Sequence, residues 1–259
     1  MCSLFIGTSG YSYKDWEEVF YPAGVNQAGY LNYYSRYFNT VEINSTYYFI
    51  PGFSMISKME TKTGNDFIFS LKAHSSITHT RDAGSDDIDS FRKSLTPLRI
   101  KRKVGALLFQ FPYSFRFSTK NLDYLKYLKL NFKQDEFVVE FRNKEWIRDS
   151  VLDFLKTSNI GFCNVDEPEL PGLMPKTDIV TSNCFYLRFH GRNREKWWNH
   201  KEAYERYDYM YSAEQLQEWV PIITEASKQN KKILVYFNNH YKAKSVRSAE
   251  ILKNLLLSE

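Results

Sequence analysis

The stretch VVEFRNKEW, residues 138–146, has the pattern of a buried strand that ends in charged residues. At a period of two residues Val139 and Phe141 fall on one face, while Val138, Glu140 and Arg142 fall on the other. A strand with helices on one face and a barrel interior on the other produces this pattern. The stretch therefore predicts a barrel strand that carries a carboxylate and a guanidinium inward at its C-terminal end.

Short apolar runs alternate with longer amphipathic stretches along the whole chain. The strand candidates are residues 4–7, 40–44, 67–72, 104–109, 137–141, 161–165, 185–189 and 233–237. Alternating strands and helices predict a parallel sheet covered by helices, and eight such units in 259 residues match a single (β/α)8 TIM-like barrel of the α/β class. No GxGxxG motif follows the first strand, which argues against an open doubly wound sheet. We predict one domain over residues 1–259.

Composition restricts the class of protein and its compartment. The net charge of +5 fits an anionic ligand without requiring one. The three cysteines form no CxxC motif, which indicates a reducing compartment. The N-terminus lacks the pattern of a signal peptide, and no run approaches the ~20 apolar residues of a membrane span. We therefore expect a cytoplasmic protein with no membrane partner, and the sequence indicates no protein partner.

The alternation seen at residues 138–146 recurs on the other strand candidates and predicts a ring of polar side chains. Its inward members are Glu42, Asn44, Lys72, His74, Gln110, Glu140, Arg142, Asp166, Arg188, His190 and Asn238. These residues gather toward the C-terminal ends of the strands, where barrel enzymes place their active sites. The sequence therefore predicts a ligand pocket at the C-terminal mouth.

Several motifs resemble those of the YecE-like family, a domain of unknown function. The resemblance runs in order along nearly the whole chain, through GTSGYSY (7–13), VEINSTYY (41–48), LFQFPYSF (108–115), VEFRNKEW (139–146), YLRFHGR (186–192) and YFNNHY (236–241). It implies a TIM-like barrel and no settled activity. The family's likeness in shape to endonuclease IV and to sugar isomerases is an analogy of fold, which is a weak guide to function.

A metal site is one hypothesis for the polar ring. Four ring residues offer oxygen or nitrogen ligands: Glu42, Glu140, Asp166 and His190. However, Lys72, Arg142 and Arg188 in the same ring would repel a cation, and the chain has no HxH or HExxH motif. We expect no bound metal and no other cofactor. A metal-dependent, sugar isomerase-like enzyme remains an alternative that requires such a metal.

Acid–base chemistry without a metal is a second hypothesis, with Glu140, His190 and Glu42 as candidate catalytic residues. Arg142 should lower the pKa of Glu140, which suits a base, and His190 is the better proton donor near neutral pH. A retaining glycosidase needs two carboxylates ~5 Å apart, whereas Glu42 and Glu140 come from strands expected to lie far apart. Cys163 falls on the outward face, which argues against a thiol nucleophile.

Anion binding is the third hypothesis and fits the ring best, because Arg and Lys bind phosphate well. The candidate ligand-binding residues are Asn44, Lys72, Gln110, Arg142, Asp166, Arg188, Arg192, Trp197, Asn238 and Asn239. The loop at residues 191–211 mixes basic and aromatic residues, as expected either of a nucleic-acid contact or of an ordinary lid.

These residues predict recognition of a phosphate-containing ligand, either a nucleotide or nucleic acid. Hydrolysis of a phosphate ester, by a phosphoesterase or endonuclease-like hydrolase, stays open. An alternative from a different functional class is a non-catalytic nucleic-acid-binding protein.

Overall fold

Eight parallel strands close into a barrel in the order β1-β2-β3-β4-β5-β6-β7-β8. The structure is a computed structural model that describes residues 2–229 and 232–258. The strands are β1 (Ser3–Ser9), β2 (Thr40–Ile43), β3 (Ile68–Lys72), β4 (Val104–Gln110), β5 (Phe137–Glu140), β6 (Gly161–Asp166), β7 (Cys184–Phe189) and β8 (Lys232–Phe237). The predicted TIM-like barrel is confirmed.

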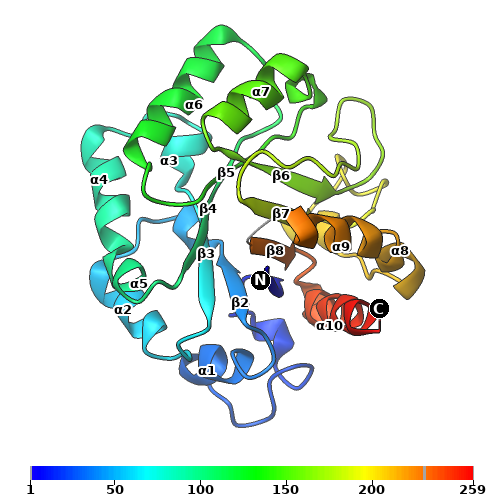
Figure 1. Cartoon of the computed structure of the whole chain (residues 1–259). Helices are drawn as coiled ribbons and strands as arrows, with labels where there is room; N and C mark the ends of the chain where they lie inside the picture. Colours follow the sequence, from blue (N-terminus) through cyan, green and yellow to red (C-terminus); the bar gives the residue numbers. More distant parts are fainter. Residues whose placement is uncertain (1, 230–231, 259) are drawn as a thin grey trace.

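Helices surround the strands (Figure 1). They are α1 (Tyr30–Tyr34), α2 (Phe53–Glu60), α3 (Ser75–Thr78), α4 (Ser85–Ser94), α5 (Thr96–Ile100), α6 (Thr119–Asn131), α7 (Asp149–Thr157), α8 (Ala213–Gln217), α9 (Val220–Gln229) and α10 (Lys244–Leu257). Short 3-10 helices lie in the loops, among them η3 (Ser45–Tyr47) and η5 (Ala203–Tyr207). Within the described residues an α-helix follows every strand except β6, whose connection to β7 at residues 167–183 is irregular.

The stretch at residues 138–146 places its side chains as predicted. Phe141 faces outward and stacks on the buried ring of Trp146, with ring centroids 4.3 Å apart. The indole N–H of Trp146 donates a hydrogen bond to the carbonyl of Phe115 at 2.6 Å. This aromatic packing fixes the loop after β5. The side chain of Glu140, the residue before Phe141, points to the opposite side, into the barrel.

Strand register corrects the prediction for β6. Cys163 pairs with Tyr186 of β7, whose hydroxyl reaches the interior, so Cys163 is inward. The predictions of an outward Cys163 and an inward Asp166 are therefore wrong. The side chain of Asn164 instead bonds the irregular connection, where it accepts from the amide of Ile179 at 2.9 Å. Polarity cannot reveal the inward face here, because every residue of β6 is buried.

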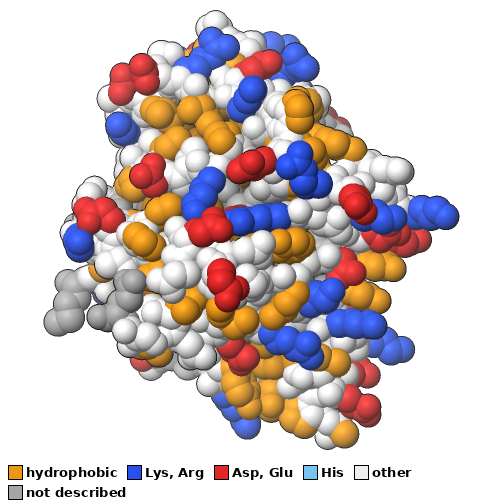
Figure 2. All heavy atoms as spheres, turned by 90° about the vertical axis from the view of Figure 1, so that its right-hand side faces the viewer, with side chains coloured by type: hydrophobic (Ala, Val, Ile, Leu, Met, Phe, Trp, Pro, Cys, Tyr) orange, Lys and Arg blue, Asp and Glu red, His pale blue; other side chains and the backbone are white. Residues whose placement is uncertain are grey.

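Charges are mixed on the outer surface that carries α8, α9 and α10. Figure 2 shows basic and acidic side chains interspersed with apolar ones over this face. Among the described helices, none combines the length and the apolar character that crossing a bilayer requires.

Candidate functional site

Buried ion pairs cross the C-terminal half of the barrel interior. Nη1 of Arg188 donates to Oε2 of Glu140, and Nη2 donates to Oε1 of Glu42, each at 2.6 Å. All three side chains are buried. The prediction that Glu42 and Glu140 lie far apart is wrong, because inward side chains meet near the barrel axis and share one guanidinium.

Glu140 is the most heavily bonded carboxylate of this network. Its Oε1 binds Nε of Arg142 at 2.8 Å and Nε2 of His190 at 3.1 Å. Burial alone would raise the pKa of Glu140, but Arg142, Arg188 and His190 outweigh it and hold that pKa well below its usual range. A low pKa agrees with the sequence argument. However, a carboxylate whose two oxygens both hold cations orients the guanidiniums and is poorly placed to take a proton.

His190 is fully buried below the mouth. Burial, with Arg142 close by, lowers its pKa to about 3, so the ring is neutral at pH 7. A neutral ring donates from Nε2 to Glu140 and accepts at Nδ1 from Asn238, 3.3 Å away. A ring that is neutral at pH 7 does not favour His190 as a proton donor, and its catalytic role stays a prediction. The amide of Asn239 donates to the carbonyls of His190 and Tyr207, which ties the loop of residues 191–211 to β8.

Above the network lies a cavity of about 560 Å³, here called the mouth cavity. Its polar wall includes Asn44, Gln110, Arg142, Arg188, Asn238 and Lys72. Aromatic side chains from the mouth loops complete it: Tyr11, Tyr13, Tyr47, Tyr48, Tyr207 and His240. The carboxylates that neutralise the two guanidiniums are absent from the lining, so a ligand in this cavity meets the basic side of the network.

A smaller cavity of about 300 Å³, here called the side cavity, adjoins the first. The two share the wall residues Tyr47, Lys72, Gln110, Arg142 and Tyr207. The side cavity extends under the loop of residues 191–211, toward Trp198 and Arg206. Together the two cavities form one region at the mouth, with Lys72 and Arg142 at their junction.

Lys72 differs from the other basic residues of the network. Its Nζ lies 4.3 Å from the ring centroid of Tyr47, and no described residue forms an ion pair or hydrogen bond with it. Burial, followed by the charge of Arg188, lowers the pKa of Lys72 to about 7. Near neutral pH this amine therefore exists in both charged and neutral forms.

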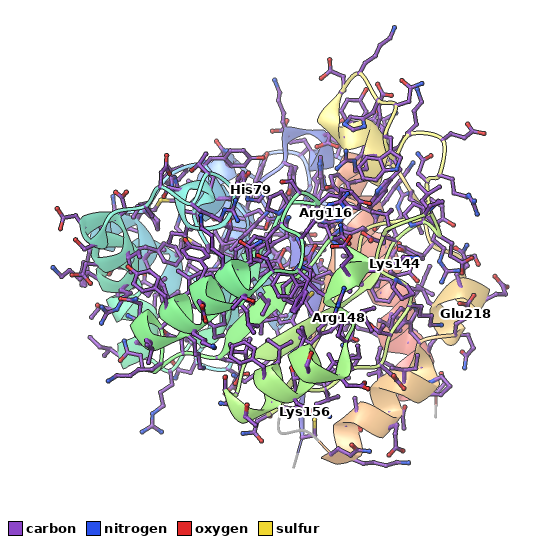
Figure 3. The ribbon with its side chains drawn as sticks, turned by 90° about the horizontal axis from the view of Figure 1, so that it is seen from above. His79, Arg116, Lys144, Arg148, Lys156 and Glu218 are labelled. Atoms are coloured by element: carbon purple, nitrogen blue, oxygen red, sulfur yellow. The ribbon has the colours of Figure 1, made fainter. Side chains whose placement is uncertain are left out.

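Asp166 and Arg192 are brought together, but away from the cavity walls. Arg192 pairs with Asp166 at 2.7 Å and with Glu218 at 3.1 Å. Asp166 also accepts hydrogen bonds from Tyr211 and Trp219, which fasten the loop to the outside of the barrel. Figure 3 shows Glu218 at the periphery, well away from His79, which lines the side cavity. Asp166 and Arg192 thus hold the loop of residues 191–211 in place.

The two tryptophans of this loop differ in exposure. Trp197 is only 1% exposed, lies against the guanidiniums of Arg142 and Arg206, and forms part of the wall of the side cavity. Trp198 is 55% exposed and lines the side cavity. The loop therefore packs as a lid that buries Trp197 and leaves Trp198 and Tyr204 exposed.

Sequence reasoning missed Glu167, which binds Arg142 Nη1 through Oε2 at 2.9 Å. Burial raises the pKa of Glu167 to about 7, although Arg142 opposes this. Glu167 follows β6 on the same parity as Cys163, so a correct register would have revealed it. The aromatic wall was also missed, because loop residues such as Tyr47 and Tyr207 have no periodicity that places them. The motif NSTYY after β2 was the available signal.

The donors proposed for a metal do not form a metal site in this structure. The part of the chain that the structure describes contains no group of three or more His, Cys, Asp or Glu side chains suited to a metal ion. Glu42 and Glu140 hold Arg188, and Asp166 holds Arg192 outside the barrel. The residues therefore do not fit the metal on which the isomerase alternative depends, and the metal content of the protein itself stays a prediction.

The fold and this pocket define a (β/α)8 barrel protein with a cation-lined and aromatic-lined cavity at its C-terminal mouth. A family model described as "Protein of unknown function DUF72" matches residues 5–259, so the chain belongs to this family. The resemblance to a family of unknown function is confirmed at that level.

Relatives cover nearly the whole chain. The UPF0759 protein YunF of Bacillus subtilis strain 168 is 31% identical over 255 residues, covering 92% of this chain and 89% of that protein. A DUF72 family crystal structure from Thermotoga maritima MSB8 superposes with a TM-score of 0.90 at 38% identity, covering 99% of both chains. Another, from Enterococcus faecalis V583, gives 0.88 at 25% identity, covering 98% of this chain and 96% of that one.

Proposed function

We propose that the protein binds a phosphate-containing ligand in the mouth cavity, either a nucleotide or the end of a nucleic-acid strand. One observation carries the proposal. Among the described residues, every charged side chain that lines the mouth cavity is basic, namely Lys72, Arg142 and Arg188. Guanidinium and ammonium groups in a concave, partly apolar site are the usual means of binding phosphate.

The balance of charge supports Lys72 as the main anchor. Arg188 and Arg142 are already paired with carboxylates behind the wall, whereas Lys72 has no such partner. An anion beside Lys72 would stabilise its charged form and supply the missing counter-charge. The aromatic wall suits the base of a nucleotide, and Tyr48 at the rim is 78% exposed.

Hydrolysis of a phosphate ester gains no support from the candidate catalytic residues. Neither Glu140 nor His190 lines either cavity, and Glu42 uses both oxygens to accept hydrogen bonds from Ser9, Tyr186 and Arg188. We therefore propose binding without assigning these residues to hydrolysis. The three free cysteines support the proposal of a reducing, cytoplasmic compartment.

A second candidate function is the binding of a polyanionic strand across the mouth. Its support is the exposure of two aromatic rings beside the adjoining cavities, Tyr48 at the rim of the mouth cavity and Trp198 in the side cavity. Strand binding would weaken steeply with salt, because phosphate contacts release counterions. Binding of a single nucleotide would depend on salt far less.

The test is isothermal titration of the protein with inorganic phosphate, adenosine monophosphate and a single-stranded oligonucleotide across a salt series. Loss of a charge-assisted hydrogen bond of about 1.5–3 kcal/mol predicts that Lys72→Met weakens binding roughly 10- to 100-fold. The matched control is Lys228→Met on α9, where Lys228 is 65% exposed, and we expect it to bind like the native protein. No binding of any of the three at low salt, or equal affinity of Lys72→Met and the control, would refute the proposal.

A further inference from the structure

Lys72 is placed like a reactive amine rather than a structural cation. It leaves the C-terminal end of β3 where the mouth cavity meets the side cavity, and it lines both. The buried Lys103 provides a contrast within the same chain. Its Nζ binds the carboxylate of Glu60 at 2.8 Å and the carbonyls of Glu60 and Thr63 at 3.0 Å each. Lys103 is thus saturated by protein groups, whereas Lys72 meets the ring of Tyr47 and open cavity.

The surroundings of Lys72 favour an amine with a free lone pair. The titratable and charged groups around it are Tyr47, His79, Arg142, Arg188 and Tyr207, with Glu42 and Glu140 bound behind the guanidiniums. Burial and two neighbouring guanidiniums oppose the charged form, while the Tyr47 ring and the two carboxylates favour it. The pKa of about 7 reflects this balance and leaves much of the amine neutral near neutral pH. Neutral amines of this kind attack carbonyl carbons.

We propose that Lys72 is a nucleophile that forms an imine with an aldehyde or ketone whose anionic group is held in the mouth cavity. The inference rests on the proposed function, because the same cavity wall binds the anionic group. For a ligand that also carries a carbonyl, the guanidiniums of Arg142 and Arg188 hold the anionic group, and attack by the neutral amine of Lys72 replaces its contact with phosphate. It narrows the ligand class to phosphate-containing compounds that also carry a carbonyl.

The step balances without an oxidant or a reductant. The lone pair of Nζ attacks the carbonyl carbon, a C–N bond forms, and the electron pair of the C=O π bond moves to oxygen, which takes a proton. The resulting carbinolamine then loses water, and a C=N bond replaces C=O. Both hydrogens of the neutral amine leave with the carbonyl oxygen. A guanidinium on the same wall stabilises the alkoxide that develops during the attack.

The test uses two carbonyl probes, pyridoxal 5′-phosphate and pyridoxal, each followed by borohydride reduction and peptide mass mapping. The phosphorylated probe should label Lys72 roughly tenfold or more faster than an exposed lysine such as Lys228, because an ordinary lysine is almost fully protonated at pH 7. The labelling rate should rise as pH increases through about 7. Lys72→Met and Lys72→Arg should both lose the adduct, and Lys72→Arg keeps the test valid if the methionine variant fails to fold. Lys228→Met should keep it.

The two probes separate this inference from the proposed function. A Lys72 adduct that forms faster with the phosphorylated probe, and that inorganic phosphate suppresses, supports both. Equal labelling of Lys72 by pyridoxal, without competition by phosphate, supports the amine and contradicts phosphate binding. Reversible binding of the phosphorylated probe with no reduced adduct at Lys72 overturns the inference and leaves the proposed function standing.

Discussion

The substitution Arg188→Met removes the guanidinium that Glu42 and Glu140 share deep in the barrel. Each carboxylate lies 2.6 Å from it, and neither side chain is exposed. Glu140 would keep Arg142, whereas Glu42 would lose its cation altogether. Removing one partner of a buried ion pair costs about 3–5 kcal/mol, because the remaining charge stays buried without compensation. Since 1 kcal/mol shifts the melting temperature of a chain of this size by about 2–4 °C, the variant should melt roughly 6–20 °C lower.

Urea unfolding followed by circular dichroism measures this loss, with Arg116→Met as the matched control. Arg116 pairs with Glu145 at 3.4 Å on the surface, where the two side chains are 64% and 38% exposed. An exposed pair contributes about 0–1 kcal/mol, so the control should lose little stability. If Arg188→Met lost no more free energy of unfolding than Arg116→Met, the description of the interior as a tightly coupled ion network would be refuted.

The pH dependence of the same variant gives an internal check. The folded-state pKa of Glu140 lies below its unfolded value, so its stabilising contribution is present above about pH 4.3 and is lost as pH falls. Removing Arg188 raises the folded-state pKa of Glu140. The difference in stability between the native protein and the variant should therefore shrink as pH falls through about 4.

Three further predictions follow from the site. The folded-state pKa of His190, about 3, lies below its unfolded value, so the stability of the protein should fall as pH drops from about 6.5 toward 3. In His190→Asn this loss of stability should be smaller, as measured by urea unfolding at a series of pH values. In thermal melts, Trp197→Ala should lose about 3–5 kcal/mol of stability, whereas Trp198→Ala should lose little. In titrations with an oligonucleotide, Trp198→Ala should weaken binding if the strand crosses the mouth and should leave it unchanged if it does not. At pH 8, phosphate binding should take up protons on Lys72, measured by calorimetry in buffers of different ionisation enthalpy, and Lys72→Met should take up fewer.

The barrel could be predicted because its signals are local. Each strand is a short apolar run, and the helical stretches between strands have their own period. The inward parity of Glu42, Glu140 and Arg188 followed from the same alternation and is confirmed by their contacts. For β6 the alternation failed, because both faces are buried and the irregular connection after it satisfies Asn164.

The site was less predictable because parity gives the face of a residue and not its depth or its partner. His190 and Lys72 both point inward, yet His190 lies beneath the mouth cavity and Lys72 lies on its wall. Only the three-dimensional structure reveals that Arg188 and Arg142 are paired with carboxylates while Lys72 is not. The partners of Arg192 are Asp166, at the end of β6, and Glu218, directly after α8, and no local sequence pattern connects these positions.

The central claim is that the mouth cavity binds phosphate through Lys72. A crystal structure of the protein soaked with adenosine monophosphate, with a parallel Lys72→Met crystal, tests it most directly. We predict phosphate density within hydrogen-bonding distance of Lys72 Nζ and beside Arg142 in the native protein, and strongly reduced density there in the variant at the same soak concentration. An empty mouth cavity in the native protein, or the same density in both crystals, would contradict the claim.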